Sequence, residues 1–562
     1  MTLRDWSIWT ILGLAGALCV MGSIAVRAQE TIASPAGAGA CPDKNAPFVE
    51  PLNEPHWNGW GVDPAEHRFQ PSAMAGLAAK DVPRLELKWA FGFPGAVRSI
   101  AQPTIIGGRA FIGSQGGKVY SLDASSGCTY WEYDAGKPVR SAVVVGPSAG
   151  GWAAYFGDLG GNVHSVDAVT GKALWTARIE DHPAAVITGA PTLVGGTLFV
   201  PVSSFEEVTG ANPNYSCCTF RGSVVALEAS TGKVLWKAYT IPNPAKPGAV
   251  NSKGVQLMGP SGAAVWSAPT FDAASRRVYV TTGDNYSDPP SATSDAILAF
   301  DSNSGELAWS RQMTSGDAYN LACGRTVAVN CPEANGPDYD FGSSALLAEL
   351  PGGKRILIGA QKSGVVTALD PDRAGEIVWQ KRVGNGGTLG GVQWGVAADQ
   401  RNVYVAVSDV KIVVVPAGTP GAQAIANSSS RAFLVDAKTG GGLVALKLDT
   451  GEEVWRTPPP GCGEVPGCSP AQLAAVTAIP GVVFSGGLDG RIRAYSSEDG
   501  RILWDVDTKG EVRTVNGVAA HGGSIDGAGP VVVGGMLYVS SGSGILGGAP
   551  GNVLLGYSVD GR

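Results

Sequence analysis

The sequence lacks the features of a nucleic-acid-binding or membrane-spanning protein. It has no run of five or more basic residues, and its formal net charge is −7, so nothing favours a polyanionic partner such as nucleic acid. Beyond the N-terminus no apolar run of 18 residues occurs, so we expect no membrane span in the mature chain. The phosphate-cradling motif G-x-x-x-x-G-K-[ST] and the haem-attachment motif C-x-x-C-H are both missing, so we expect neither a nucleotide-phosphate loop nor covalent haem.

Turn-forming residues, by contrast, are abundant. The 80 glycines and 37 prolines favour many short strands joined by turns over long helices, because glycine supplies positive φ and proline fixes φ. With 44% hydrophobic and 16% charged residues, the chain can bury a large core. The composition therefore predicts a globular protein built of strands.

The N-terminus has the pattern of an export signal. Arg4 precedes an apolar run over residues 6–26, and small residues lead to Ala28, which is typical of a secretory signal peptide cleaved at that point. The run is also long enough to remain as an anchor. We expect a signal peptide over residues 1–28, an extension over residues 29–50, and export to the periplasm.

Cysteine usage agrees with an exported protein. Apart from Cys19 in the signal, eight cysteines remain, an even number that suits disulfides in an oxidising compartment. Spacing and elimination favour three pairs, which are Cys323 with Cys331, Cys462 with Cys468, and Cys41 with Cys128. Adjacent Cys217 and Cys218 either form a strained bridge with each other, bond elsewhere or stay free. The sequence alone leaves the pairing open.

The strongest pattern is an internal repeat. GKVYSLDASSGCTYW, from Gly117, returns as GNVHSVDAVTGKALW from Gly161 and as GSVVALEASTGKVLW from Gly222. Further copies begin at Asp295, Gly364, Gly441, Gly490 and Gly551. Each copy is an alternating strand, a turn closed by glycine and a second strand ending in tryptophan, which indicates a hairpin. Such repetition is typical of a propeller.

The two ends of the chain complement each other. The copy from Gly551 stops before its tryptophan, while LELKW near the N-terminus ends at Trp89. An N-terminal strand that completes the last blade would cover both free edges of the ring. We therefore predict an all-β fold, one eight-bladed β-propeller over residues 51–562. The repeat tryptophans are expected to pack between blades.

The repeat does not explain several segments. They are the vicinal cysteines, TGAP from Thr188 with a serine fifteen residues later, and VWSAPTFD, NGPDYDFGSS, QKSG, GVQWG and GKPVRS. Together these segments resemble the quinoprotein alcohol dehydrogenases, which carry pyrroloquinoline quinone (PQQ). WNGWGVDPAEHRFQPSAMAGLAAKDVPRLELKWAFGFPG and SCCTFRG are similar to the polyvinyl-alcohol dehydrogenase branch. The resemblance covers nearly the whole chain after residue 50.

This resemblance implies a site that holds PQQ and calcium. The implied PQQ contacts are Arg140, Thr188, Ser203, Cys217, Cys218, Trp266, Lys362, Gln393 and Trp394. The implied calcium ligands are Glu206 and Asp284, where the family commonly has asparagine at the second position. Glu207 is an alternative to Glu206, because Ser204 gives it the same spacing from a serine.

The resemblance also implies a mechanism. Asp340, rather than Asp338, would act as general base, and Lys362 would stabilise the reactive quinone carbonyl. A glutamate that the family has near the first blade finds only Gln102 here, so one PQQ contact differs.

The implied activity is oxidation of a secondary or polymeric alcohol, such as polyvinyl alcohol, to a ketone or aldehyde. Electrons would pass to a separate soluble cytochrome c. Two other functions stay open. One is a non-enzymatic periplasmic propeller scaffold, and the other is a quinoprotein dehydrogenase for sugars or small alcohols.

Overall fold

The computed structural model describes most of the chain after the export signal. It covers residues 39–562 except 45, 47, 49–51, 324–327, 425–429, 464, 466 and 545–546. The predicted signal peptide over residues 1–28 and much of the extension over 29–50 lie outside the described residues. Within the described part, no helix is long and apolar enough to cross a membrane.

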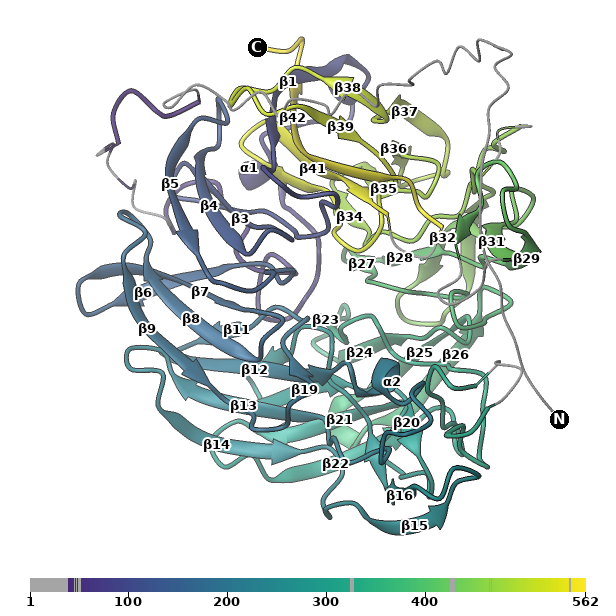
Figure 1. Ribbon diagram of the computed structural model, residues 1–562. Helices are drawn as coiled ribbons and strands as arrows, with labels where there is room; N and C mark the ends of the chain where they lie inside the picture. The colour runs from purple at the N-terminus through teal and green to yellow at the C-terminus, as the bar shows by residue number, and fades with distance from the viewer. Residues whose placement is uncertain are drawn as a thin grey trace, which may run out of the picture.

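Eight antiparallel sheets stand around a central axis, one for each sequence repeat (Figure 1). The first blade consists of β2 (Thr104–Ile106), β3 (Arg109–Gly113), β4 (Lys118–Asp123) and β5 (Thr129–Asp134), and the second of β6 (Val144–Ser148), β7 (Gly151–Gly157), β8 (Asn162–Asp167) and β9 (Ala173–Arg178). The third blade consists of β10 (Ala185–Val186), β11 (Thr192–Val194), β12 (Thr197–Ser204), β13 (Ser223–Glu228) and β14 (Val234–Tyr239). The fourth blade consists of β18 (Thr270–Asp272), β19 (Arg277–Thr281), β21 (Ala296–Asp301) and β22 (Leu307–Gln312).

The last four blades complete the ring. They consist of β23 (Leu346–Glu349), β24 (Arg355–Ala360), β25 (Val365–Asp370) and β26 (Glu376–Arg382); β27 (Ala397–Ala398), β28 (Asn402–Val407), β32 (Gly442–Lys447) and β33 (Glu453–Thr457); β34 (Thr477–Ile479), β35 (Val482–Gly486), β36 (Arg491–Ser496) and β37 (Ile502–Asp507); and β40 (Val531–Val533), β41 (Met536–Ser543), β42 (Pro550–Val559) and β1 (Leu85–Gly92).

Short elements decorate the blades. They are α1 (Ser72–Ala75), η1 (Val82–Arg84), α2 (Glu206–Thr209), η2 (Pro371–Arg373), and the small sheets of β15 (Lys246–Val250) with β16 (Gln256–Gly259), β17 (Ser261–Gly262) with β20 (Asn285–Ser287), β29 (Ile412–Pro416) with β31 (Arg431–Val435) and β30 (Gln423–Ala424), and β38 (Gly510–Val512) with β39 (Ala520–Gly522). These insertions make up little of the fold, so the predicted all-β class is confirmed.

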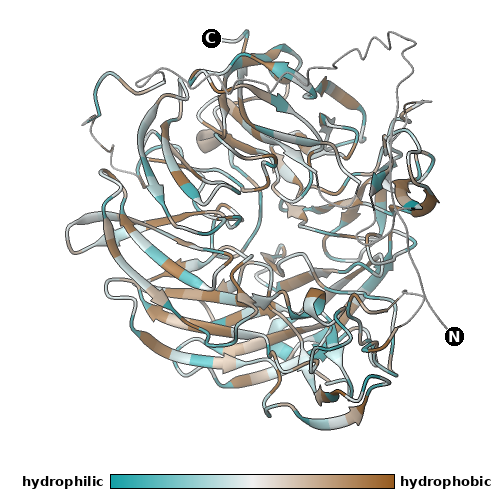
Figure 2. Ribbon diagram, viewed as in Figure 1, coloured by the Kyte–Doolittle hydropathy of each residue, from teal (hydrophilic) through white to brown (hydrophobic). Residues whose placement is uncertain are grey.

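The N-terminal strand closes the ring as the sequence predicts. β1 pairs antiparallel with β42, from Leu85 opposite Val559 to Gly92 opposite Val553. The first and last strands of the propeller thereby hydrogen-bond within one blade, which closes the ring. Hydrophobic residues along the strands, brown in Figure 2, form clusters between neighbouring blades, such as the buried cluster that joins Phe484 and Ile492 to Leu537 and Leu555.

Each blade is fastened to the next by the repeat tryptophan. The indole N–H of Trp175 donates to the carbonyl of Ala229 in the following blade at 3.0 Å. Gly232, in the same turn, faces the ring so closely that an added Cβ would lie 2.6 Å from Trp175 Cε3. The same contact joins Trp89 with Gly127, Trp131 with Gly171, Trp236 with Gly305, Trp309 with Gly375, Trp379 with Gly451, and Trp455 with Gly500. Glycine is therefore required in this turn for two reasons. It adopts the positive φ, and without a Cβ it leaves space for the indole.

Alanine at Gly232 should be markedly more destabilising than alanine at Gly136. Both glycines have nearly the same positive φ, +73° and +71°, but nothing lies within 4 Å of a Cβ at Gly136. The backbone strain of about 1–2 kcal/mol is common to both, and overpacking against the indole adds about 1–3 kcal/mol at Gly232 alone. Urea unfolding midpoints of Gly232→Ala and Gly136→Ala measure the difference, and equal losses would contradict the packing argument.

Candidate functional site

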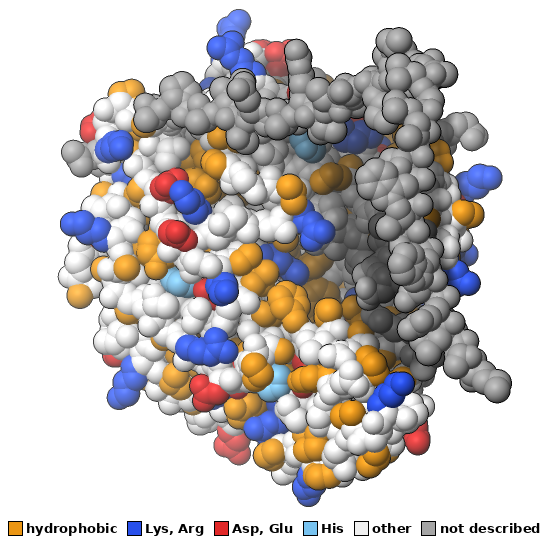
Figure 3. All heavy atoms as spheres, in the orientation of Figure 1, with side chains coloured by type: hydrophobic (Ala, Val, Ile, Leu, Met, Phe, Trp, Pro, Cys, Tyr) orange, Lys and Arg blue, Asp and Glu red, His pale blue; other side chains and the backbone are white. Residues whose placement is uncertain are grey.

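The chemistry-bearing residues meet at one end of the propeller axis. In an antiparallel blade, the link from the second to the third strand and the link into the next blade lie at the same end. Asp284 and Lys362 follow the second strands β19 and β24, whereas Arg140, Trp266 and Asp340 precede the innermost strands β6, β18 and β23. In Figure 3 hydrophobic side chains border the hollow near the centre of the described part of this face.

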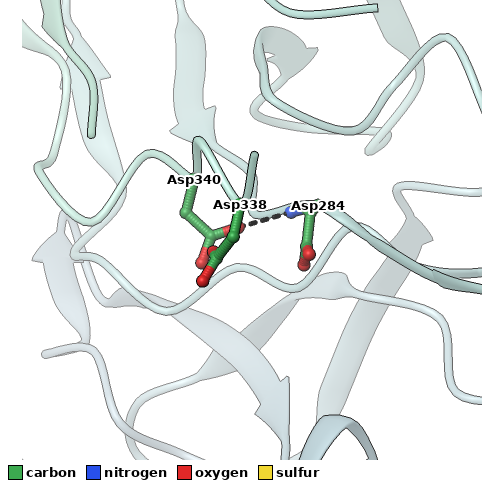
Figure 4. A group of neighbouring side chains, drawn as sticks. All are labelled: Asp284, Asp338 and Asp340. Carbon is green, nitrogen blue, oxygen red and sulfur yellow. Dashed lines mark hydrogen bonds between the residues drawn. The ribbon is translucent and has the colours of Figure 1, made fainter. Parts of the chain in front are cut away.

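Three aspartates form an acidic cluster, defined as Asp284, Asp338 and Asp340 (Figure 4). One carboxylate oxygen of each lies within 4.8 Å of the others, and all three residues are buried. The backbone N–H of Asp284 donates to Asp340 Oδ1 at 2.6 Å. Lys362 Nζ donates to Asp338 Oδ1 at 2.8 Å and to Asp340 Oδ2 at 2.9 Å. The structure thus brings together Asp284, Asp340 and Lys362, which the sequence analysis singled out separately.

The cluster carries more negative charge than the protein itself neutralises. Burial and the charges of Asp340 and Asp338 raise the pKa of Asp284 well above its ordinary value. Burial alone would lower the pKa of Lys362, but Asp338 and Asp340 raise it well above the usual range, so the ammonium stays charged. Asp284 Oδ2 is buried without a hydrogen-bond partner among the described residues. Buried carboxylates of this kind fit a hard cation such as calcium.

The two adjacent glutamates at the start of α2 point to different surroundings. Glu206 accepts hydrogen bonds from Tyr215 and from the backbone N–H groups of Thr219 and Phe220. Although burial opposes it, these bonds and one from His182 hold the pKa of Glu206 below its ordinary value.

Glu207 interacts with the charges of the acidic cluster instead. Burial and the charge of Asp340 raise the pKa of Glu207 to about 7, with Lys362 opposing, and Glu207 in turn contributes to the raised pKa of Asp284. The oxygens of Glu206 are engaged by the fold, so the geometry favours the alternative register, in which Glu207 is the residue available to a cation.

An aromatic pocket adjoins the cluster. Its lining includes Arg140, Thr188, Trp266 and Trp394, four residues that the resemblance assigned to PQQ. The rings of Trp266 and Trp394 stand at 88° with centroids 5.4 Å apart, and the Arg140 guanidinium lies 4.7 Å from the centroid of Trp394. Thr188 Oγ1 is buried with no partner in the described part of the chain. Flat aromatic faces, a cation and an unpaired hydroxyl fit a planar carboxylated quinone.

All four disulfides join described cysteines. Cys217 bonds to Cys218, and the other three pairs are the ones that spacing favoured in the sequence. Both vicinal cysteines are buried in the hydrophobic cluster against which Trp266 packs. The disulfide predictions are confirmed, and the vicinal bridge lies in the same cluster as the pocket tryptophan.

The remaining predicted residues lie near the pocket with engaged side chains or backbones. Ser203 is buried near the end of β12, opposite Val186 of β10. The Gln393 amide donates to the carbonyl of Gly390 at 2.9 Å. Gln102 accepts from Arg68 and donates to backbone carbonyls, so its amide is occupied within the fold.

Asp526 was missed by the sequence analysis, although it bonds to the pocket residue Trp394. Its carboxylate accepts the indole N–H of Trp394 and the hydroxyl of Ser543. Burial raises the pKa of Asp526, and its charge counteracts the desolvation that lowers the pKa of Arg140 to about 10. Its position in the sequence could have identified it, because Asp526 lies in the loop before the innermost strand β40, as Trp266 lies in the loop before the innermost strand β18.

Asp295 was also missed. It opens the fourth repeat where most other copies have glycine, and it keeps a positive φ of 48°. Both of its carboxylate oxygens are buried without a partner among the described residues. Burial and the nearby charges of Asp340 and Asp317 raise its pKa well above the ordinary value. The sequence feature that could have identified Asp295 is a carboxylate at a position where the repeat has glycine.

Comparison with known families and proteins gives consistent matches. Residues 57–325 match a family model described as "Glucose/ethanol/alcohol dehydrogenase, beta-propeller domain", and residues 362–544 match "Outer membrane protein assembly factor BamB". The chain is 42% identical to a polyvinylalcohol dehydrogenase of a Pseudomonas species over 92% of this chain and 79% of the relative. It is 38% identical to the polyvinylalcohol dehydrogenase of Sphingopyxis sp. strain 113P3, over 90% and 77%.

Solved structures share the fold. A quinohemoprotein alcohol dehydrogenase of Pseudomonas putida HK5 superposes with a TM-score of 0.64 at 19% identity, covering 91% of this chain and 81% of that one. A europium-containing methanol dehydrogenase gives 0.65 at 18% identity, covering 90% and 98%. At these identities the likeness concerns the eight-bladed fold alone.

The bond between Trp394 and Asp526 should appear as a coupling energy. Trp394→Phe removes the N–H donor and Asp526→Ala removes the acceptor, so the double mutant should lose less than the sum of the singles by about 1–3 kcal/mol. Urea unfolding of the four proteins at pH 7 gives this value. A matched cycle of Asp526→Ala with Trp175→Phe should be additive within about 0.5 kcal/mol, since Trp175 bonds to Ala229 whereas Asp526 bonds to Trp394 and Ser543. Additivity in both cycles would show that Asp526 does not hold Trp394.

Proposed function

Because this chain belongs to the PQQ-dependent quinoprotein alcohol dehydrogenases, we propose that it oxidises polyvinyl alcohol or a similar secondary polymeric alcohol at the acidic cluster. Identities of 42% and 38% to two polyvinylalcohol dehydrogenases, over most of each chain, carry the substrate proposal. Phe205 and Val208 are exposed on either side of Glu206 and Glu207. Apolar side chains at the rim suit a methylene backbone whose hydroxyl reaches the acidic residues.

The residues of the pocket divide into those for the quinone and those for a cation. Trp266 and Trp394 offer ring faces, Arg140 offers a guanidinium for a quinone carboxylate, and the unpaired Thr188 hydroxyl offers a hydrogen bond. Ser203, Gln393 and the vicinal disulfide remain proposed contacts. When bound, PQQ supplies the acceptor for the hydride, and calcium supplies Lewis acidity beside it.

Calcium is proposed at Asp284 and Glu207. Asp284, Asp338, Asp340 and Glu207 would bear four negative charges if all were ionised, against one positive charge on Lys362. Oxygen ligands of this kind are those that calcium prefers. Glu206, the residue first expected from the sequence, is the alternative, but its oxygens already accept bonds from the backbone.

Within the site, the protein's own groups would handle the substrate proton. The base is proposed in the pair Asp338 and Asp340, which Lys362 joins. The resemblance favours Asp340. The geometry favours Asp338, because only its Oδ1 accepts a bond, from Lys362, whereas Asp340 accepts bonds on both oxygens. Lys362 lies 5.6 Å from the Trp266 ring centroid, where its charge would stabilise negative charge on a quinone held by these residues.

Electrons are proposed to leave to a separate soluble cytochrome c, because oxidation of an alcohol by a bound quinone requires an electron acceptor. A periplasmic location is proposed on the basis of the N-terminal export pattern and the four disulfides. The propeller over residues 51–562 is proposed as one domain.

Two asparagine variants test the base. Asparagine keeps the shape of aspartate but removes the basic oxygen, so the variant that lacks the base should lose about 10²–10⁴-fold in turnover while it still binds PQQ. Turnover is measured with polyvinyl alcohol and an artificial dye acceptor. A loss confined to Asp340→Asn supports the sequence assignment, and a loss confined to Asp338→Asn supports the geometric one. Normal turnover in both variants would remove the proposed base.

Glutamine variants of the two glutamates test the metal assignment. Glu207→Gln should weaken calcium binding to the PQQ-loaded protein by at least about tenfold, since a ligand charge is lost. Glu206→Gln is the matched control and should change calcium affinity little, although it weakens the fold around Thr219. Calorimetric titrations measure the calcium affinity. Titrations at pH 6, 7 and 8 also show whether protons compete with calcium for the carboxylates.

The sign of the pH dependence follows from the raised pKa values. Glu207, with a pKa of about 7, is increasingly protonated below that pH, and a cation must displace the proton. Calcium affinity of the wild-type protein should therefore rise from pH 6 to pH 8. Loss of calcium binding in Glu206→Gln but not in Glu207→Gln would reverse the assignment, and pH-independent binding would place the ion elsewhere.

A further inference from the structure

An N-terminal segment, residues 57–70, runs around the propeller axis before the first blade begins. It hydrogen-bonds to the innermost strands of seven of the eight blades. Trp57 bonds to β2, Asn58 to β6, Pro64 to β18, Ala65 to β23, His67 to β27, and Gln70 to β34 and β40. In Figure 1 this purple segment crosses the middle of the ring. The innermost strands, which have no strand partner toward the axis, thereby gain backbone bonds.

Arg68 is the charged centre of this segment. It is 1% exposed, and its guanidinium donates from Nε to the carbonyl of Val476 at 2.7 Å, and from Nη1 to the carbonyl of Trp60 at 2.6 Å and to Gln102 Oε1 at 2.8 Å. Burial lowers the pKa of Arg68 to about 9, and the charge of Glu66 opposes the shift. A desolvated cation of this kind is costly unless its donors are used, so its geometry is tightly defined.

The group that Arg68 holds most closely is Trp60. The guanidinium carbon lies 4.9 Å from the Trp60 ring centroid, in addition to the bond to the Trp60 carbonyl. Gln102 Nε2 donates to the same carbonyl at 2.8 Å. An added Cβ at Gly529 would lie 2.2 Å from Arg68 Nη2, so a small residue is needed there for the guanidinium to fit.

Trp60 in turn lines the aromatic pocket with Arg140, Trp266 and Trp394. Its ring packs against an alanine cluster that comes from the entrances of three successive blades, Ala142, Ala190 and Ala268. Trp60 is therefore the residue through which the axial segment contacts the proposed quinone site.

We propose that residues 57–70 form an axial plug, and that Arg68 is a positioning residue which holds Trp60 as the floor of the quinone pocket. Arg68 acts through Trp60 and Gln102. The inference rests on the proposed PQQ site and adds residues that the family resemblance did not assign.

The test measures PQQ affinity of the apoprotein. Arg68→Met, which keeps a long apolar side chain but removes the charge and the donors, should raise the PQQ dissociation constant by at least about tenfold, as should Trp60→Ala. Arg109→Met is the matched control. Arg109 is also 1% exposed and lies over an aromatic ring, 4.0 Å from the centroid of Tyr130, but it donates to Ala46 and Val169, outside the pocket.

Fluorescence titration with PQQ and calcium, together with the unfolding midpoint of each variant, separates a positioning role from a structural one. Weaker PQQ binding in Arg68→Met, with the affinity of Arg109→Met within about twofold of wild type, supports the plug. Unchanged affinity in Arg68→Met, or an equal loss in Arg109→Met, would overturn it. If Arg68→Met does not fold, Trp60→Ala decides in the same way. A wild-type protein that binds no PQQ would instead overturn the proposed function.

Discussion

The contact between a repeat tryptophan and the turn glycine of the next blade is the constraint on which the rest of the structure depends. It fixes the angle between blades through a ring face and an indole N–H bond, and the pairing of β1 with β42 makes the angle close into a ring. Closure brings equivalent loops of all blades to one end of the axis. Residues as distant in sequence as Arg140 and Trp394 can then line one pocket.

The site arises where this regular pattern is broken. Asp295 replaces a repeat glycine, Asp526 lies in the loop before the inner strand β40, and the vicinal cysteines interrupt the third repeat. Each of these departures from the repeat places a polar or reactive group in the buried region at one end of the propeller axis. An unpaired carboxylate there costs free energy of folding. We therefore propose that a cation completes the acidic cluster and that the aromatic pocket beside it takes the flat quinone.

The fold was predictable because its signals are local and repeated eight times, as at Trp175 and Gly232. Trp266, Asp284 and Lys362 were found through short motifs in the loops that lead into or out of the inner strands. Glu206 and Glu207 were not separable, because a shift of one residue on the short helix α2 reverses which carboxylate faces the cluster. Arg68 and Asp526 were not predicted from the sequence. Arg68 bonds to Val476 and Asp526 bonds to Trp394, and these contacts form only when the ring closes.

The central claim is that the acidic cluster and the aromatic pocket form one metal–quinone site. Crystals of the protein loaded with PQQ and calcium, measured at a long wavelength, test it directly. The account predicts one anomalous peak at about 2.3–2.6 Å from carboxylate oxygens of Asp284 and Glu207, with the quinone against Trp266. Quinone bound there with no peak beside Asp284, or a peak at Glu206 instead, would contradict it.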